Sequence, residues 1–371
     1  MKNLLKTLLK RDILILTTLF MLFTAALYGA FYLKDHSLVT VYKNWDGPGY
    51  VMAAMSMYVP KVAYEHNIVG SVDIHPYWTW LPAEFPLYPL AIRLFSFLGY
   101  FKAMLWLSVL GSLVATIAFY ELATTVCRKP YALRLAIIFM LIPPRWFIVS
   151  HVGTAESWFM AFLILFLMWW QQGKMGWAAG AAALAEASHP RGALLMIAIG
   201  IGALVEIIKN RRQWLAVVRR YVPFLVVPAT LLAVFTFYKV QTGDFYAFFS
   251  AIKLFQSTTW LPFQTFTYPN TNIETFWQEA NALYYVLYLA APLMLIKTKY
   301  WRLAVYGLVY FVPLIFLRHS DISRYALPLV PVFLVAFHDI FEQKAVTWAA
   351  LLMSPAVMMY AFNFMMWNHA A

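Results

Sequence analysis

Long apolar runs separated by short polar segments make up most of the chain. Eleven of these runs approach the roughly 20 residues that a helix needs to cross the hydrocarbon core of a bilayer. The predicted spans are 13–33, 102–123, 131–149, 155–171, 175–188, 192–208, 221–240, 283–296, 303–317, 325–341 and 346–366. The chain is therefore predicted to be an all-α, polytopic membrane protein of about eleven transmembrane helices.

Two longer segments interrupt the apolar pattern, residues 34–101 and 241–282. Both are rich in aromatic residues, proline and acidic residues. Within the first, the run 87–98 is too short to span and contains Pro89 and Arg93. We expect this run to be a helix that lies on the membrane surface. The whole chain, residues 1–371, is predicted to form one membrane domain with these two long loops.

Composition agrees with this pattern. Of the residues, 63% are hydrophobic and 12% are charged, whereas soluble domains carry about 25% charged residues. Lipid must therefore surround much of the chain. The first apolar run is longer than the core of a secretory signal and no cleavage site follows it, so we interpret it as an uncleaved span. The single cysteine, Cys127, allows no intramolecular disulfide and is interpreted as structural.

The basic charge follows the topology. The net charge is +12, and the Lys and Arg residues cluster in short connections such as 209–220 and 297–302. An N-terminus on the cytoplasmic side places more than half of the 28 Lys and Arg residues in cytoplasmic segments, as the positive-inside rule requires. The charge therefore implies no nucleic-acid partner, and the C-terminus is predicted to lie outside.

Nearly all of the unusual polar residues then fall on the outer face. They lie in the loops 34–101 and 241–282 and in short turns such as 188–192 and 318–324. A purely structural scaffold has no need for this segregation. An active site at the outer surface of the membrane, extracytoplasmic or lumenal, would produce it.

The strongest local signal is the segment 44–50, Asn-Trp-Asp-Gly-Pro-Gly-Tyr, directly after the first span. Its glycines and proline force a tight turn that would present the Asp46 carboxylate from a fixed backbone. Trp45 and Tyr50 are aromatic residues of the kind found at membrane interfaces, and they could stack on a sugar. The alternative is that Asp46 caps a helix that begins near Gly47.

A second signal lies later in the same loop, where His75 and Glu84 stand among prolines and aromatic residues. The prolines predict a rigid, non-helical segment. His75 and Glu84 are candidates for acid–base chemistry or for binding a polar substrate. The alternative for both is a solvated loop.

His151 and Glu156 flank the start of a predicted helix. A carboxylate in the first helical turn suits the helix dipole, which accounts for Glu156 without any function. That account does not extend to His151, so both residues remain candidates for substrate binding.

Arginines occupy two of the outer turns. His189 and Arg191 lie where one predicted span ends and the next begins, and Arg318 and Arg324 share the turn 318–324. Arginines near helix N-termini and within membranes suggest an anion to bind. The alternative for Arg318 and Arg324 is snorkelling to phospholipid headgroups.

No metal site or nucleotide site is evident. The sequence has no His-Glu-x-x-His motif, no paired cysteines, no phosphate-binding P-loop and no dinucleotide-binding glycine motif. Four histidines that could contribute to a metal site, His75, His151, His189 and His319, lie in four separate loops. We therefore predict no cofactor and no required divalent metal.

Several of these segments resemble the PIG-V family of mannosyltransferases, which belong to the membrane-embedded GT-C glycosyltransferases. The matching segments occur in order between about residues 44 and 330. They are Trp45-Asp46-Gly47 with Tyr50, Phe85 to Pro89, Glu156-Ser157, Arg191-Gly192, Gly243-Asp244 and Arg324-Tyr325. The chain departs from the family pattern at Glu84, where an aromatic residue is expected, and at His189-Pro190.

The resemblance implies a GT-C fold and an inverting transfer of a sugar, mannose in this family, from a polyprenyl or dolichyl phosphate. The acceptor would be a glycolipid, a glycan or a protein. Asp46 would be the catalytic base, with Glu84 a second candidate, and Arg191, Arg318 and Arg324 would bind the donor phosphate. The predicted substrate-binding residues are Trp45, Tyr50, His75, His151, Glu156, His189, Asp244 and Tyr325.

Two other classes of protein remain open at this point. A transporter or flippase would favour polar residues at mid-membrane and an inverted repeat, and neither is evident in the sequence. A non-enzymatic subunit of a membrane complex would not depend on Asp46. The sugar could also be an aminosugar or a pentose.

Overall fold

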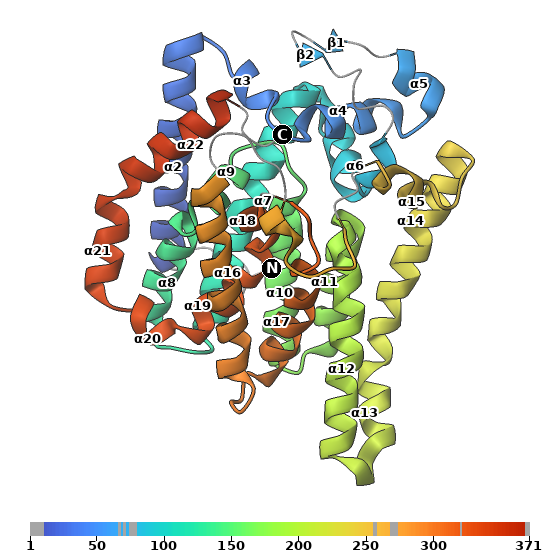
Figure 1. Ribbon diagram of the computed structural model, residues 1–371, viewed down its shortest axis with the longest axis vertical. Coiled ribbons are helices and arrows are strands. Elements are labelled where there is room, and N and C mark those ends of the chain that lie inside the picture. The colour runs from blue at the N-terminus through green and yellow to red at the C-terminus, as the bar shows by residue number, and fades with distance from the viewer. Residues whose placement is uncertain are drawn as a thin grey trace. The chain divides into compact units, whose positions relative to one another are not determined.

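The computed structural model describes residues 11–65, 68–69, 72–73, 80–254, 258–267, 274–319 and 321–367 (Figure 1). These residues are almost entirely helical. Their one sheet is a two-stranded antiparallel ribbon of β1 (Ile68–Val69) and β2 (Val72–Asp73), with Val69 opposite Val72. The chain divides into two compact units. Unit 1 comprises 1–78, 88–164 and 338–371, and unit 2 comprises 79–87 and 165–337.

Unit 1 is built around α2, which packs against α7, α8 and α22. The buried residues of α2 recur every three or four positions, which places them on one face of a helix. They are Ile13, Leu16, Phe20, Thr24, Leu27 and Phe31. The helices of this unit are α2 (Arg11–Asp35), α3 (Val39–Tyr42), α4 (Gly47–Ser56), α5 (Pro60–Glu65), α6 (Leu87–Leu94), η2 (Ser96–Leu98), α7 (Tyr100–Ala123), α8 (Lys129–Leu141), α9 (Pro144–Val149), α20 (His338–Phe341), α21 (Lys344–Leu352) and α22 (Ser354–Trp367).

Helix α10 (Glu156–Gln171) continues from unit 1 into unit 2. In unit 2, α16 packs against α17 and α19, and α11 packs against α14. The helices of this unit are α11 (Met175–Ser188), η3 (Pro190–Gly192), α12 (Ala193–Lys209), η4 (Arg211–Gln213), α13 (Trp214–Tyr221), η5 (Val222–Leu225), α14 (Val226–Thr242), α15 (Ala247–Ile252), η6 (Gln264–Thr267), α16 (Glu274–Leu295), α17 (Trp301–Leu314), α18 (Ile322–Tyr325), η7 (Leu327–Leu329) and α19 (Val330–Ala336).

Four helical stretches of the described residues are long and apolar enough to cross a membrane: Arg11–Asp35, Tyr100–Ala123, Pro190–Lys209 and Arg211–Thr242. A fifth is obtained if α21 and α22 count as one span, although they are bent by 45°. Every predicted apolar run coincides with helix, but proline shortens several of the helices. The run 131–149, for example, is broken into α8 and α9 at Pro143 and Pro144. The count of eleven spans therefore stays a prediction.

The predicted surface helix 87–98 forms α6 followed by the short η2. The guanidinium of Arg93 on α6 donates to the backbone carbonyls of Ala54 and Met55, each at 3.0 Å. These carbonyls lie in the last turn of α4, where a helix leaves its acceptors unsatisfied and a positive charge is favourable. Arg93 thus ties α6 to the helix that begins directly after Asp46.

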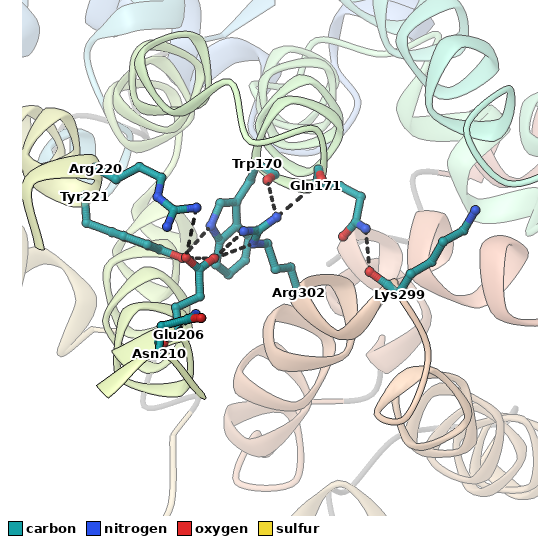
Figure 2. Close-up of polar contacts among 8 residues, drawn as sticks. All are labelled: Trp170, Gln171, Glu206, Asn210, Arg220, Tyr221, Lys299 and Arg302. Atoms are coloured by element: carbon teal, nitrogen blue, oxygen red, sulfur yellow. Dashed lines mark hydrogen bonds and ion pairs between the residues drawn. The ribbon is translucent and has the colours of Figure 1, made fainter. Parts of the chain in front are cut away.

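A polar cluster joins the ends of four helices (Figure 2). Glu206 on α12 is 4% exposed, and its Oε1 accepts hydrogen bonds from Arg302 on α17 and from the Tyr221 hydroxyl at 3.0 Å. Arg220 pairs with the other carboxylate oxygen at 3.4 Å. Arg302 also donates to the carbonyls of Trp170 and Gln171 at the end of α10. A buried carboxylate requires such partners, and here they connect the ends of α10, α12, α13 and α17.

Candidate functional site

The turn that carries Asp46 is the centre of the candidate site in unit 1. Asp46 directly precedes α4, and its carbonyl accepts a hydrogen bond from the Tyr50 amide at 2.9 Å. Its side chain, however, makes no capping hydrogen bond to the helix. The capping role that the sequence left open for Asp46 is therefore wrong, and the turn holds the half-buried carboxylate through its backbone.

Three neighbours of Asp46 fix this backbone. Trp45 is 5% exposed and lies in the left-handed region, with φ of 50°, where a non-glycine residue is strained. Asn44 donates its side-chain amide to the carbonyl of Thr40 at 2.9 Å and to that of Met365 at 3.0 Å. Gly47 admits no side chain, because a Cβ there would lie 2.9 Å from the carbonyl oxygen of Tyr42. The position of Asp46 is thus set before any substrate binds.

Arg145 lies beside this turn and was missed by the sequence analysis. It is 3% exposed on α9, and its guanidinium lies 4.1 Å from the centre of the Phe364 ring. The same ring contacts Trp45 edge to face, with the centroids 5.9 Å apart. Phe364 therefore contacts both a buried cation and Trp45, the residue that precedes Asp46. The available signal was an arginine deep in the apolar run 131–149, which also contains Arg134 near its start; charge within such a run is expensive and usually functional.

Tyr50 was predicted to be an interface aromatic residue, but it is 1% exposed. Its ring meets Tyr88 edge to face at 4.9 Å. The Tyr88 hydroxyl in turn donates to the carbonyl of Met104 at 2.8 Å and lies 2.6 Å from the Ser108 hydroxyl. Tyr50 thus packs α4 against α6 and α7, and contact with a sugar by its ring stays a prediction.

His151 is fully buried, and both of its ring nitrogens have partners. Nε2 lies 3.0 Å from the Thr24 hydroxyl, and Nδ1 lies 2.7 Å from the carbonyl of Phe147. Burial lowers the pKa of the imidazole to about 4, so His151 is neutral at physiological pH. These contacts join α2 to the segment after α9, which accounts for His151 structurally. Substrate binding by its ring stays a prediction.

Glu156 begins α10, as predicted, and is 4% exposed. The next residue, Ser157, accepts a hydrogen bond from Ser112 on α7 at 2.9 Å. The first turn of α10 is therefore buried in unit 1 against α7. Substrate binding by Glu156 stays a prediction.

Unit 2 contains the turn of His189 and Arg191, two of the predicted site residues. The His189 Nδ1 accepts a hydrogen bond from the Arg191 amide at 3.1 Å, which closes the short helix η3. The Arg191 guanidinium lies 4.5 Å from the centre of the Tyr325 ring. His189 therefore shapes the turn, and the turn places Arg191 over Tyr325.

The segment 319–325 completes this cluster. The ring of His319 packs on Tyr325, with the centroids 4.9 Å apart. Asp321 caps α18, because its Oδ1 accepts from the Arg324 amide at 3.1 Å and from the Ser323 hydroxyl at 2.6 Å. The structure thus brings three of the predicted residues together in unit 2, namely Arg191, Arg324 and Tyr325.

Glu186 is a second residue that the sequence analysis missed. It is fully buried on α11, and its two carboxyl oxygens take no hydrogen bond from the described residues. It lies against the Arg191 turn: a Cβ at Gly192 would be 2.4 Å from the Glu186 Cα and 2.8 Å from its Oε2. Buried carboxyls without partners are costly and mark functional sites. The sequence feature that could have revealed Glu186 is that it is the single acidic residue in the alanine-rich run 175–188.

The remaining predicted residues lie elsewhere. Glu84 is half-buried, and its carbonyl accepts from the Tyr238 hydroxyl at 3.0 Å. Asp244 is exposed, and its Oδ1 accepts from the Tyr246 amide at 2.8 Å in a local turn. Arg318 is exposed beside His319. His75 lies outside the described residues.

Two further features bear on the chemistry. Among the described residues, no group of three or more His, Cys, Asp or Glu side chains is placed to hold a metal ion. Unit 1 also contains an apolar cavity of about 140 Å³ between α2 and α7, lined in part by Thr24, Tyr42 and Trp106. Its lining suits a hydrocarbon chain better than a sugar.

No protein-family model matches the chain, and the search of curated proteins returned no match. Among solved structures, the chain is similar to ArnT from Cupriavidus metallidurans bound to undecaprenyl phosphate. The TM-score is 0.54 at 15% sequence identity, and the match covers 92% of this chain and 63% of ArnT. The fold of this chain is GT-C-like.

The fold confirms the all-α, GT-C-like part of the fold class predicted from the sequence, and with the apolar helices it supports an integral membrane protein. The chain spans less than two thirds of the length of ArnT. The finer resemblance to the PIG-V family, the orientation in the membrane and the roles of individual residues stay predictions.

Proposed function

We propose that this protein is an inverting glycosyltransferase that moves a sugar from a polyprenyl phosphate to an acceptor hydroxyl. The observation that carries the proposal is the Asp46 turn of a GT-C-like fold, in which backbone geometry and not a helix cap holds the carboxylate. The structure of ArnT, which contains undecaprenyl phosphate, supports the class of donor. The predicted sugar is mannose, as in the PIG-V family that the motifs resemble.

The reaction follows from the chemistry of a held carboxylate. Asp46 accepts the proton of the acceptor hydroxyl while the hydroxyl oxygen attacks C1 of the sugar. The bond between C1 and the phosphate oxygen breaks on the opposite face, so the anomeric configuration inverts and polyprenyl phosphate leaves. The leaving group is a phosphate monoester rather than a diphosphate, so its charge can be balanced by arginines, and we propose that no divalent metal is required.

Each unit supplies arginines suited to a phosphate. In unit 1, Arg145 is buried beside the Asp46 turn. In unit 2, Arg191 lies over Tyr325, and Arg324 belongs to the helix that ends at Tyr325. Arginine presents a planar set of donors that matches phosphate oxygens. We assign donor-phosphate binding to these three residues and to the exposed Arg318.

The remaining assignments concern the sugar, the lipid chain, a second acid or base and the acceptor. Trp45, at the edge of Phe364, is assigned to the sugar, and the apolar cavity between α2 and α7 to part of a lipid chain. Glu84 is assigned as the second candidate acid or base. The acceptor is proposed to be a glycolipid, a glycan or a protein at the outer face of the membrane.

The decisive experiment measures sugar transfer to a membrane lipid extract by purified wild type and Asp46→Asn. The donor is radiolabelled polyprenyl-phosphate mannose, followed by a panel of other polyprenyl-phosphate sugars. Asparagine is nearly isosteric with aspartate but accepts no proton at neutral pH. We expect transfer by the wild type and a loss of about a hundredfold or more in the variant.

Thermal unfolding of both proteins provides the control, because the Asn variant must remain folded. Equal transfer by the two proteins would remove Asp46 as the base and direct attention to Glu84. Absence of transfer by the wild type with every donor would contradict the proposal and favour a transporter or a non-enzymatic subunit.

A further inference from the structure

The turn between α12 and α14 in unit 2 carries a dense positive charge. Figure 1 shows the two helices running side by side, with α13 at the turn. Its five cations, Lys209, Arg211, Arg212, Arg219 and Arg220, are all exposed. Three of them, Lys209, Arg211 and Arg212, line an open hollow of about 400 Å³ formed by residues 208–213. No carboxylate lies in the turn itself, since residues 208–221 contain neither Asp nor Glu.

The nearest acid, Glu206, pairs with only one of these five cations, Arg220. Glu206, one turn before Lys209, is already bound by Arg302 and Arg220 (Figure 2). The Lys209 ammonium lies 4.5 Å from the centre of the Trp301 ring. The side chains of Arg211 and Arg212 make no hydrogen bond or ion pair with other described residues. The hollow thus presents at least two guanidinium groups that are available to an external anion.

The surroundings of the hollow are those of a membrane boundary. The turn joins two stretches long and apolar enough to span a bilayer, Pro190–Lys209 and Arg211–Thr242. Beside it, α13 exposes Trp214 and Leu215, which are 51% and 53% exposed, while Val217 on its other face is buried. Tryptophan concentrates at the level of lipid headgroups. An anion at this depth is most readily a lipid phosphate.

The Glu206 cluster gives the turn a fixed shape. The Asn210 side chain donates to the Glu206 carbonyl at 3.1 Å, and the Tyr221 hydroxyl donates to the Glu206 carboxylate. Both ends of the segment 210–221 are therefore fastened to one residue of α12. A charged turn that is fastened in this way loses less conformational freedom on binding than a flexible basic tail.

We propose that residues 208–215 form a binding site for the headgroup of an anionic phospholipid. Arg211 and Arg212 bind the phosphate, and Trp214 and Leu215 enter the interface beside the acyl chains. The site is independent of the proposed transfer reaction and uses none of its residues. Basic residues next to membrane spans attract anionic lipids in this way.

The site can be tested by photo-crosslinking with the full-length protein in phosphatidylcholine nanodiscs. Trace photoactivatable phosphatidylglycerol is the anionic probe, and the same probe with a choline headgroup is the neutral one. Peptide mapping is expected to place the phosphatidylglycerol label within residues 208–215. Arg211→Gln with Arg212→Gln should weaken this labelling about thirtyfold, at roughly fivefold for each charge removed near the membrane surface.

Matched variants separate the site from general charge. Arg211→Lys with Arg212→Lys keeps both charges and should retain most of the labelling. Arg128→Gln with Lys129→Gln removes two exposed charges from another connection and should leave it unchanged. Equal labelling by the choline probe, or no loss in the Arg211→Gln and Arg212→Gln variant, would overturn the proposal. Displacement of the label by excess inorganic phosphate would show a site for a soluble anion and would also overturn it.

Discussion

Glu206 and Asp46 both place a carboxylate in a largely apolar protein, but the two are held by different means. Glu206 is 4% exposed and is surrounded by side chains, with Arg302, Arg220 and Tyr221 on its two oxygens. At Asp46 the main chain is fixed, between the left-handed Trp45 and the first turn of α4. The Glu206 carboxylate therefore holds the ends of several helices together. The Asp46 carboxylate instead projects from a turn whose backbone is already fixed. Removal of the Glu206 carboxylate should lower the stability of the fold, and removal of the Asp46 carboxylate should lower the rate of sugar transfer.

The largest effect is expected at Glu206. Glu206→Ala leaves the 13% exposed side chain of Arg302 without its carboxylate, and breaking a buried ion pair in this way typically costs about 3–5 kcal/mol. Thermal unfolding in detergent would measure the loss. Glu206→Leu combined with Arg302→Leu should recover most of it, because no buried charge remains unpaired. An unchanged melting temperature in Glu206→Ala would contradict the structural role.

Arg145 should behave like Asp46 rather than like Glu206. Arg145→Gln removes the cation beside the Asp46 turn and is expected to lower the rate of sugar transfer about a hundredfold, as the loss of one stabilising donor commonly does. Arg145→Lys should recover part of the rate, because it restores charge without the planar donors. The assay is initial-rate transfer per folded molecule.

Arg93 provides the matched control for Arg145. It lies in the same unit, but its guanidinium donates to the carbonyls of Ala54 and Met55 at the end of α4. Arg93→Gln should lower the melting temperature and leave the transfer rate of the remaining folded protein nearly intact. A rate loss equal to that of Arg145→Gln would mean that both effects are structural.

A smaller effect is expected at Gly192, where the absence of a side chain lets the Arg191 turn pack against Glu186. Gly192→Ala places a Cβ about 2.4 Å from the Glu186 Cα, so the Arg191 turn must shift. Overpacking of this kind costs about 1–3 kcal/mol. Transfer should fall together with stability, measured by the two assays above. Gly176→Ala, where no atom lies within 4 Å of the added carbon, should change neither.

The smallest effect concerns His151 and pH. Its folded pKa of about 4 lies below the ordinary value of 6.5, so the unfolded chain binds a proton first and stability falls as the pH drops through this window. At pH 5.5 the loss amounts to about 1 kcal/mol. The melting temperatures of wild type and His151→Gln, compared between pH 7 and 5, should show a weaker pH dependence in the variant.

Local patterns in the sequence determined the helical architecture and the turn at Asp46. Apolar runs of helical length predicted helices such as Arg11–Asp35 and Tyr100–Ala123, because hydrophobicity and helix length depend only on neighbouring residues. The glycines and proline after Asp46 predicted a tight turn for the same reason. Proline breaks and short helices limited the prediction of spans, since the bend between α21 and α22 depends on packing as well as sequence.

Tertiary structure decided which side chains meet. Phe364 joins Arg145 to Trp45, and Tyr325 joins Arg191 to His319, although each pair is far apart in sequence. It also decided that both ring nitrogens of His151 are engaged in unit 1. Such contacts arise when helices from distant segments pack together, and no local periodicity encodes them. The sequence therefore determined a helical membrane protein with a tight turn at Asp46, and packing decided which aromatic rings Arg145 and Arg191 contact.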